Sequence, residues 1–390
     1  MSKLLIKNAS IVLPDGVSEN SSLLAVDGEI VDFGKTCESP DDAEMIDAEN
    51  GYLLPAFIEL HAHGGGGFDF ADMSRESFDT VMKTHLSHGV SLLCPTLVAS
   101  EWQKTVEFLK FCDEYGKSSP MFLGVHLEGP FLSPIMCGAQ KPGLIIEPDE
   151  SKIAELAEFS HLLSCITAAP EIDGAEDLAK ALVPKGVSLS VGHSNADAEE
   201  MKRAAAWGFS RVTHLFCSTS RRTKHGSFVV GGIEECALID DSFTVELIGD
   251  GHHISRESFM LTQKCKKNNG IVLVSDAMRA AGQAGVTESF LGELCPENRV
   301  IIEDGVAKLP DRSCFAGSVA VGDTMVQALC GNYGLSIVDV SHMMSAVPAR
   351  LLGLSDRGSI AEKNKAELVL LDKKFKTIRV FSDSARYYYV

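Results

Sequence analysis

The chain has 390 residues, of which 45% are hydrophobic and 23% are charged, so its composition is that of a globular protein. The formal net charge is −19, with 54 acidic against 35 basic residues, which argues against a nucleic-acid-binding or membrane-binding surface. No apolar run has the length of a membrane helix, and the first residues lack the apolar segment of a secretory signal. The eleven cysteines form no C-x-x-C pair. We therefore expect a reduced, cytoplasmic protein.

Short strand-like segments lie at both ends of the chain. Turn signals at 14–16 and 27–29 punctuate the first group, and the predicted strands span 4–6, 10–13, 23–33, 366–371 and 377–381. Neither end is long enough to bury a core alone. The sequence therefore predicts a small β-sandwich domain made from residues 1–54 plus 356–390.

Between these ends, short apolar runs alternate with segments of helical periodicity. Such continuous runs suit parallel strands covered on both faces, and they span 56–60, 91–97, 121–127, 163–168, 187–191, 210–214, 243–248 and 271–275. Helices are predicted over 74–88, 101–115 and 196–207. Eight such repeats predict an α/β fold, a (β/α)8 barrel over residues 55–355, with a doubly wound sheet as the alternative.

Ionisable residues follow most of these predicted strands. His61 and His63 project to the same side of the first strand because strand side chains alternate. Further candidates end or follow later strands: Glu128, His193, His214, Asp250, His253 and Asp276. In a barrel the carboxyl ends of the strands converge on one face, whereas in an open sheet they spread along an edge. This recurrence favours the barrel.

Nitrogen and carboxylate ligands without thiolate suit a divalent ion, zinc or ferrous iron. Asp276 is then the candidate general base and acid, with an additional metal ligand or a helix cap as the alternatives. The H-x-H pair taken alone also fits two satisfied core histidines. Cys217 we interpret as a thiol that lines the pocket rather than a nucleophile.

Several longer motifs occur in a specific order: LPAFIELHAHGGGG (54–67), GVHLEGPFLSP (124–134), GAQKPG (138–143), VGHSNA (191–196), THLF (213–216), GDGHHIS (249–255), VLVSDAM (272–278) and FAGS (315–318). Together with the tail at 348–372, they cover nearly the whole chain. With these motifs the sequence resembles the amidohydrolase superfamily, and within it the N-acetylglucosamine-6-phosphate deacetylase family. The resemblance implies hydrolysis of the acetamide of a phosphorylated amino sugar, with release of acetate.

The resemblance also implies roles for individual residues. Glu128, His193 and His214 would hold the principal metal ion, and His61 with His63 would provide a second position shared through Glu128, so that one or two ions bind. Asp276 matches the catalytic aspartate. The implied substrate-binding residues are Ala139, Gln140, Cys217, Ser218, His225, His253, Phe315, Ala316 and Gly317.

Two stretches depart from the family pattern. Cys217-Ser218-Thr219 replaces Asn-Ala-Met, and 225–228 replaces Arg-Glu-Pro-Gly, whose arginine reaches the phosphate bound in the neighbouring subunit of a homodimer. His225 is a poorer anion ligand than arginine because it is only partly charged and lacks the bidentate fork. Arg221, Arg222 and Lys224 form a basic cluster beside it that is either a replacement phosphate site or a solvated loop.

Other functions fit parts of this pattern. The altered loop suits N-acetylgalactosamine 6-phosphate, an unphosphorylated N-acetyl sugar or another N-acyl compound as substrate. A cyclic-amide hydrolase or nucleoside deaminase often uses a carboxylated lysine between two metals, but no lysine ends a predicted strand here. An amino-sugar-binding protein without activity would have no need of Asp276 as a proton shuttle.

Overall fold

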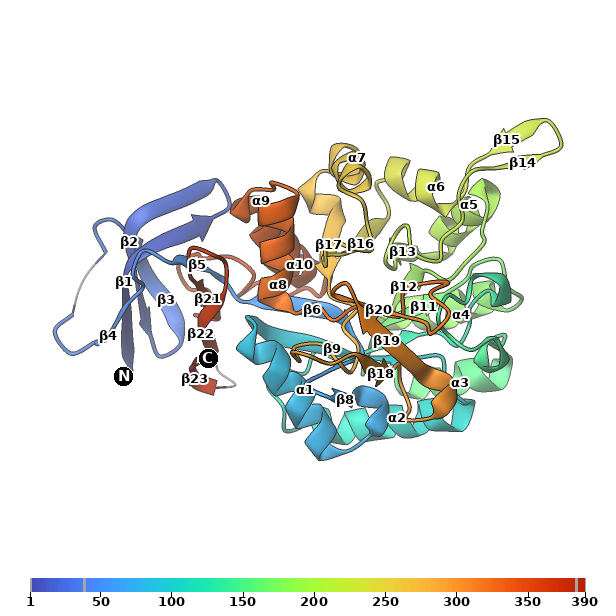
Figure 1. Cartoon of the computed structure of the whole chain (residues 1–390), viewed down its shortest axis with the longest axis horizontal. Helices are drawn as coiled ribbons and strands as arrows, with labels where there is room; N and C mark the ends of the chain where they lie inside the picture. The colour runs from blue at the N-terminus through green and yellow to red at the C-terminus, as the bar shows by residue number, and fades with distance from the viewer. Residues whose placement is uncertain (1, 38–39, 383–384, 390) are drawn as a thin grey trace.

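The computed structural model describes residues 2–37, 40–382 and 385–389. A barrel surrounded by helices forms most of the molecule, and a smaller sheet at one side contains both chain ends (Figure 1). Within the described ranges, no helix has both the length and the apolar character needed to cross a membrane.

The barrel is one parallel eight-stranded sheet, and its strands are β6 (Phe57–Ala62), β9 (Val90–Val98), β10 (Val125–Glu128), β11 (Leu163–Ala168), β12 (Ser188–Val191), β13 (Phe209–Val212), β16 (Thr244–Ile248) and β17 (Ile271–Val274). The sheet closes where Ala62 pairs in parallel with Ala277. There the Asp276 amide donates to the His61 carbonyl at 2.9 Å. The (β/α)8 barrel predicted from the sequence is thereby confirmed.

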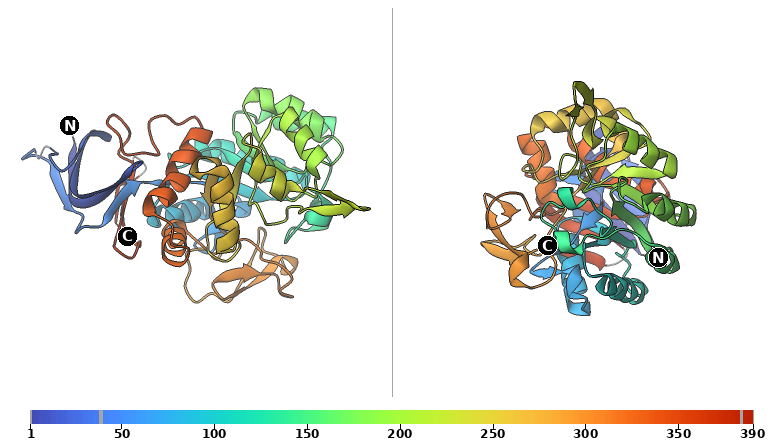
Figure 2. Two further views of the ribbon diagram at one scale, coloured as in Figure 1. Left: turned by 90° about the horizontal axis from the view of Figure 1, so that it is seen from above. Right: turned by 90° about the vertical axis from the view of Figure 1, so that its right-hand side faces the viewer.

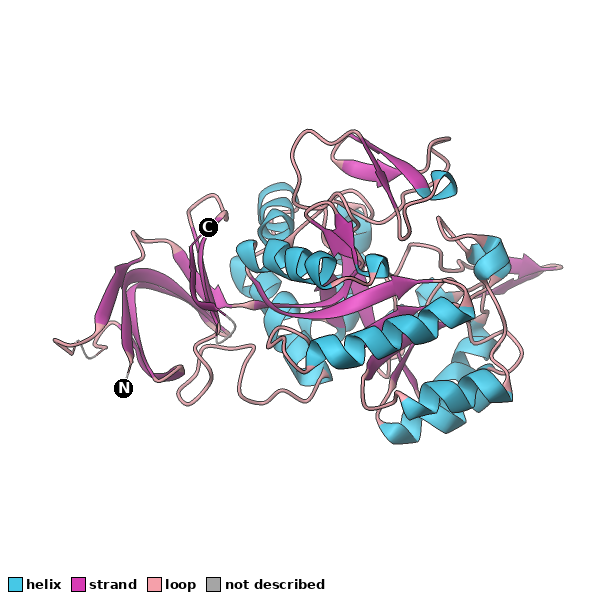
Figure 3. Cartoon of the chain, turned by 90° about the horizontal axis from the view of Figure 1, so that it is seen from below, coloured by secondary structure: helices cyan, strands magenta, loops and turns pink. Residues whose placement is uncertain are grey.

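Helices follow the strands around the barrel and cover its outer surface (Figure 3). They are α1 (Arg75–Ser87), α2 (Trp102–Gly116), α3 (Glu150–Glu158), α4 (Ala175–Leu182), α5 (Ala198–Trp207), α6 (Ile233–Ile239), α7 (Arg256–Lys266), α8 (Gly322–Gln327), α9 (Ile337–Ser341) and α10 (Val347–Leu351). Ser74 and Asp197 cap α1 and α5 by accepting hydrogen bonds from backbone amides of the first turn. Because helices cover one side of each strand and the barrel core covers the other, strands such as β6 and β10 are buried along their whole length.

The small domain is a mixed eight-stranded sheet of β1 (Lys3–Leu13), β2 (Gly16–Val26), β3 (Glu29–Gly34), β4 (Glu44–Asp47), β5 (Tyr52–Pro55), β21 (Leu368–Leu371), β22 (Thr377–Ser382) and β23 (Ala385–Tyr389). The sheet curves over a core of its own (Figure 3). Antiparallel pairing of β5 with β21 joins the two chain ends immediately before the chain enters the barrel.

Two details of this domain differ from the predicted strands. The segments predicted at 4–6 and 10–13 belong to the single strand β1, because the positive φ of Asn8 (55°) absorbs an irregularity without ending the pairing. The single strand predicted at 23–33 is instead divided between β2 and β3. Asp27 and Gly28 both have positive φ, the geometry of a tight hairpin turn.

Three insertions extend from the barrel. The first is the short pair β7 (Gly64–Gly65) and β8 (Phe68–Asp69). The second is a hairpin of β14 (Thr223–His225) and β15 (Phe228–Val230) that projects away from the barrel (Figures 1 and 2). The third is a three-stranded sheet of β18 (Glu288–Phe290), β19 (Arg299–Glu303) and β20 (Val306–Lys308), inserted between β17 and α8.

His85 lies on α1 and is fully buried, and we expect it to lower the stability of the protein in acid. One ring nitrogen, Nε2, donates to the Gly64 carbonyl at 3.0 Å, and burial lowers the pKa of the imidazole to about 4. The unfolded chain takes up this proton near pH 6.5 whereas the folded chain does not, so folding stability is lost as the pH falls from 6.5 towards 4. We expect His85→Gln, which keeps a donor, to remove about 3 kcal/mol of this acid destabilisation. Urea unfolding at pH 7 and pH 4 measures the free energy of unfolding of the original protein and of the variant. Equal losses of this free energy between pH 7 and pH 4 in the two proteins would contradict the prediction.

Candidate active site

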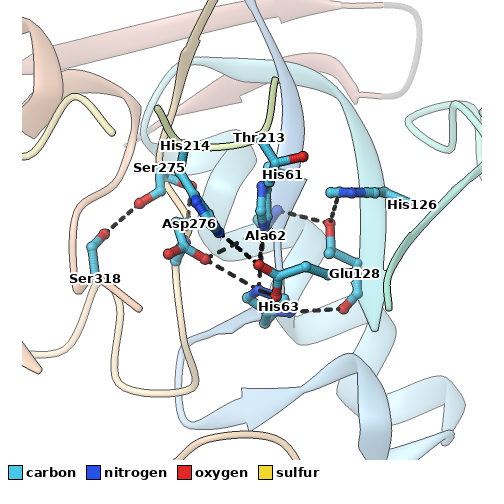
Figure 4. Close-up of polar contacts among 12 residues, drawn as sticks. His61, Ala62, His63, His126, Glu128, Thr213, His214, Ser275, Asp276 and Ser318 are labelled. Carbon is cyan, nitrogen blue, oxygen red and sulfur yellow. Dashed lines mark hydrogen bonds and ion pairs between the residues drawn. The ribbon is translucent and has the colours of Figure 1, made fainter. Parts of the chain in front are cut away.

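The predicted site residues meet at the carboxyl end of the barrel. His61 lies on β6, Glu128 is the last residue of β10, and the others follow the ends of their strands within a few residues: His63, His193, His214 and Asp276. All six are buried, with exposed fractions of 7% or less. Figure 4 shows His61, His63, His214 and Asp276 directed towards Glu128. The strand order therefore brings together side chains more than 200 positions apart in the sequence.

Glu128 occupies the centre of this cluster. Its Oε1 atom lies 2.9 Å from Nε2 of His193 and 2.8 Å from Nε2 of His214. Its Oε2 atom lies 3.4 Å from Nε2 of His63, and Oε1 lies 3.7 Å from Nε2 of His61. Burial alone would raise the pKa of Glu128, but the charges and hydrogen bonds of these histidines hold it well below its usual range. The carboxylate is therefore ionised and shared between two histidine pairs.

Backbone carbonyls fix the orientation of three imidazoles. In each ring Nδ1 donates to a carbonyl oxygen: His63 to Thr96 at 3.2 Å, His193 to Met136 at 3.0 Å, and His214 to Cys217 at 3.1 Å. When such a ring is neutral, a proton on Nδ1 leaves the Nε2 lone pair free, and each Nε2 faces Glu128. This arrangement of a ring held through its outer nitrogen is typical of metal-binding histidines.

His61 is held by a charged pair that the sequence reasoning missed. Its Nδ1 atom lies 3.1 Å from Oε2 of Glu246, and Arg211 donates to the other oxygen of the same carboxylate. Burial would raise the pKa of Glu246, but Arg211 and His61 lower it well below its usual range. The feature of the sequence that could have revealed this pair is the single charged residue within each of two apolar strands, β13 and β16.

The donor set fits a divalent metal ion. The ligand atoms of His61, His63 and Glu128, and those of Glu128, His193 and His214, form two groups in which all atoms lie within 4.8 Å of one another. The Nε2 atoms of His61 and His63 are 3.3 Å apart. The lone pairs of neutral rings and the carboxylate oxygens directed at one another repel unless a proton or a metal ion lies between them, and imidazole with carboxylate suits transition-metal ions.

Asp276 faces the same space from the end of β17. Its Oδ1 atom lies 3.1 Å from Nε2 of His63 and 3.4 Å from Nε2 of His61. Burial would raise the pKa of Asp276, but His63 and His61 lower it, so the side chain is a carboxylate at neutral pH. Asp276, His193 and His214 all have positive φ, at 49°, 47° and 28°. Such strain at non-glycine residues clusters at functional sites, where it directs side chains that a regular strand would not.

A cavity of about 600 Å³ opens above the cluster. Its wall includes seven of the predicted substrate-binding residues: Ala139, Gln140, Cys217, Ser218, His253, Phe315 and Gly317. Gln140 Nε2 lies 3.3 Å from Nε2 of His193, and the His253 and Phe315 rings are 4.6 Å apart. His253 is held by Asp250 Oδ2, 2.7 Å from its Nδ1. Burial raises the pKa of the Cys217 thiol, which fits a neutral lining group.

The other predicted residues, which are Ala316, His225 and the basic cluster, do not all line the cavity. Ala316 is buried in the core of the inserted sheet and is absent from the cavity wall. Arg221 lines the cavity, whereas Arg222 and Lys224 are exposed and lie outside its lining. The backbone of His225 belongs to β14, and its side chain lies outside the described part of the structure.

Two charged residues of the cavity wall were not predicted, Lys308 and Arg312. Both precede the FAGS motif in the sequence VAKLPDRSCFAGS. Their position in an insertion of irregular pattern concealed them, because neither follows a barrel strand.

Comparison with known proteins agrees with this geometry. The sequence profile of the amidohydrolase family matches residues 52–387. An N-acetylglucosamine-6-phosphate deacetylase from Lysinibacillus sphaericus is 29% identical over 374 residues, which are 95% of this chain and 94% of that protein. An N-acetylgalactosamine-6-phosphate deacetylase from Escherichia coli O157:H7 is 28% identical, over 94% of this chain and 95% of that protein.

A solved structure is similar to this chain over nearly its whole length. The crystal structure of N-acetylglucosamine-6-phosphate deacetylase from Thermotoga maritima superposes with a TM-score of 0.83 and 32% sequence identity, covering 98% of each chain. With the barrel, the clustered histidines and a profile match across most of its length, the chain belongs to the amidohydrolase family and is a hydrolase of carbon–nitrogen amide bonds.

Proposed function

We propose that this enzyme hydrolyses the N-acetyl group of N-acetylglucosamine 6-phosphate to give glucosamine 6-phosphate and acetate, in a metal-dependent reaction. The observation that carries the proposal is the position of Glu128 between two histidine pairs, with Asp276 facing the same space. The names of its relatives support the choice of an N-acetyl amino-sugar phosphate as substrate.

Glu128, His193 and His214 would hold the principal metal ion, and His61 and His63 would hold a second one through Glu128. Imidazole and carboxylate ligands favour Zn²⁺ or Fe²⁺. When bound, such an ion supplies Lewis acidity, which polarises the amide carbonyl and lowers the pKa of water to about 7.

The chain's own residues supply the proton transfers. Asp276, kept ionised by its histidine neighbours, accepts a proton from the attacking water and passes it to the amide nitrogen as the carbon–nitrogen bond breaks. Gln140 and His253 stand on the cavity wall, where they orient the acetamide and the sugar. The water oxygen ends in acetate, and both water protons end on the released amine, which leaves as an ammonium group.

Substrate choice is tested by measuring acetate release from four compounds: N-acetylglucosamine 6-phosphate, N-acetylgalactosamine 6-phosphate and the two unphosphorylated sugars. We expect the phosphorylated glucosamine derivative to have the highest kcat/KM, by at least about 10-fold, because a charge-assisted contact to phosphate contributes roughly 1.5–3 kcal/mol. Preference for the galactosamine derivative would instead assign the function of the Escherichia coli relative. No acetate from any of the four would contradict the proposal.

We also propose that the enzyme acts as a homodimer. The β14–β15 hairpin projects from the barrel, and Phe228 and Val229 near its tip are 77% and 65% exposed (Figure 1). Exposed apolar side chains on a projecting arm fit contact with a second copy of the chain.

A further inference from the structure

The cavity wall carries positively charged side chains that are not part of the cluster around Glu128. Among the described residues that line it, the permanently charged cations are Arg221, Lys308 and Arg312. Lys308 is the last residue of β20, and Arg312 lies in the turn that follows it, so both belong to the insertion beside the mouth of the barrel (Figure 2). In a chain of net charge −19, these two cations bring positive charge to one part of the cavity wall.

Backbone pairing places these two residues near the sugar-binding wall. Lys308, at the end of β20, pairs antiparallel with Phe315, and the Leu309 amide donates to the Cys314 carbonyl at 3.1 Å. Phe315 in turn contacts His253, with ring centroids 4.6 Å apart. Lys308 is therefore directly across the hairpin from a cavity-lining residue that contacts His253. Arg312 lies in the tight turn between the two hairpin arms, with a φ of 61°.

Both cations pair with carboxylates of the same insertion. Lys308 Nζ lies 2.7 Å from Asp304 Oδ2, and Arg312 binds Glu303 through Nε at 3.0 Å and Nη2 at 2.7 Å. The Arg312 side chain is 59% exposed, so its pairing with Glu303 is weak and readily exchanged. A phosphate group matches the guanidinium fork and the ammonium point charge as well as these carboxylates do.

Arg221 is a weaker candidate for binding a phosphate group. It stands alone on its side of the cavity, because its basic neighbours Arg222 and Lys224 lie outside the lining. Its Nε atom is 3.0 Å from Oε1 of Glu234, in a pair whose side chains are 72% and 13% exposed.

We infer that Lys308 and Arg312 bind the phosphate of the amino-sugar phosphate within the same subunit. This assignment rests on the proposed function and deepens it by naming the residues that distinguish phosphorylated from unphosphorylated substrate. It places phosphate recognition on the β20 hairpin rather than on residues 221–225.

The test compares K308A, R312A and the double variant with R221A, using acetate release from N-acetylglucosamine 6-phosphate and from N-acetylglucosamine. R299A is the matched control, because Arg299 lies in the same sheet, pairs with Glu288 and is outside the cavity wall. We expect each single variant to lower kcat/KM for the phosphate ester about 10-fold and the double variant about 100-fold, mainly through KM. Turnover of the unphosphorylated sugar should stay unchanged, which also shows that the variants fold.

Other outcomes separate the inference from the proposed function. Loss of phosphate preference in R221A, with K308A and R312A unchanged, would overturn the inference and leave the deacetylase activity standing. A fall for both substrates in the double variant would likewise overturn it, since the hairpin would then have a structural role. Failure of the unmodified enzyme to release acetate from either sugar would overturn the proposed function itself.

Discussion

Asp276→Asn is expected to lower kcat for deacetylation by a factor of about 10³ while leaving the metal content unchanged. Asparagine has the size and shape of aspartate but cannot accept the water proton at neutral pH. The side chain lies 3.1 Å from Nε2 of His63, so the neutral amide still fits the space. Steady-state acetate release gives kcat, and elemental analysis of the purified variant gives its metal content.

Asp177→Asn is the matched control, because Asp177 is exposed on α4 and is not part of the cavity wall. It should retain both activity and metal. Activity of the Asp276 variant within 10-fold of the original enzyme, a difference of about 1.4 kcal/mol in barrier, would show that another group moves the proton. Loss of metal from that variant would show that Asp276 is a ligand rather than the base.

The second large effect is expected for Glu128→Gln, which should release the metal and lower acetate release by at least about 10³-fold. Glu128 is the carboxylate shared by both histidine groups, so this one change weakens both positions at once. Its amide would also place a nitrogen donor or a neutral oxygen against His193 and His214, which lie 2.9 and 2.8 Å from the present Oε1.

The metal content of the Glu128 variant after dialysis measures the predicted release of metal directly, and circular dichroism shows whether the barrel remains folded. Glu199→Gln, an exposed change on α5, is the control for loss of one negative charge. Retention of a full complement of metal by the Glu128 variant would mean that the histidines bind the ion without the shared carboxylate.

The sequence predicted the barrel and its central site because both depend on local, regular signals. Apolar runs mark strands that are buried on both faces, and β17 ends only one residue before the end of its predicted run. His61, Glu128 and His214 each occur at a strand end, so the barrel topology alone brings them together.

Features that depend on contacts between distant segments were harder to predict. Glu246 and Arg211 support His61 through a buried pair that joins neighbouring strands. Lys308 reaches the cavity only because β20 folds back against Phe315 within an insertion. In the same way, β1 continues through Asn8 because its partner β2 maintains the pairing on both sides of the irregularity. Periodicity within a single segment contains none of this information.

The most direct test of metal-dependent deacetylation is acetate release from N-acetylglucosamine 6-phosphate by enzyme stripped of metal with a chelator and then titrated with Zn²⁺ or Fe²⁺. We expect no turnover in the stripped enzyme and recovery that saturates at one or two ions per chain, the capacity of the two groups around Glu128. Full activity in protein shown by elemental analysis to contain no metal would contradict the account.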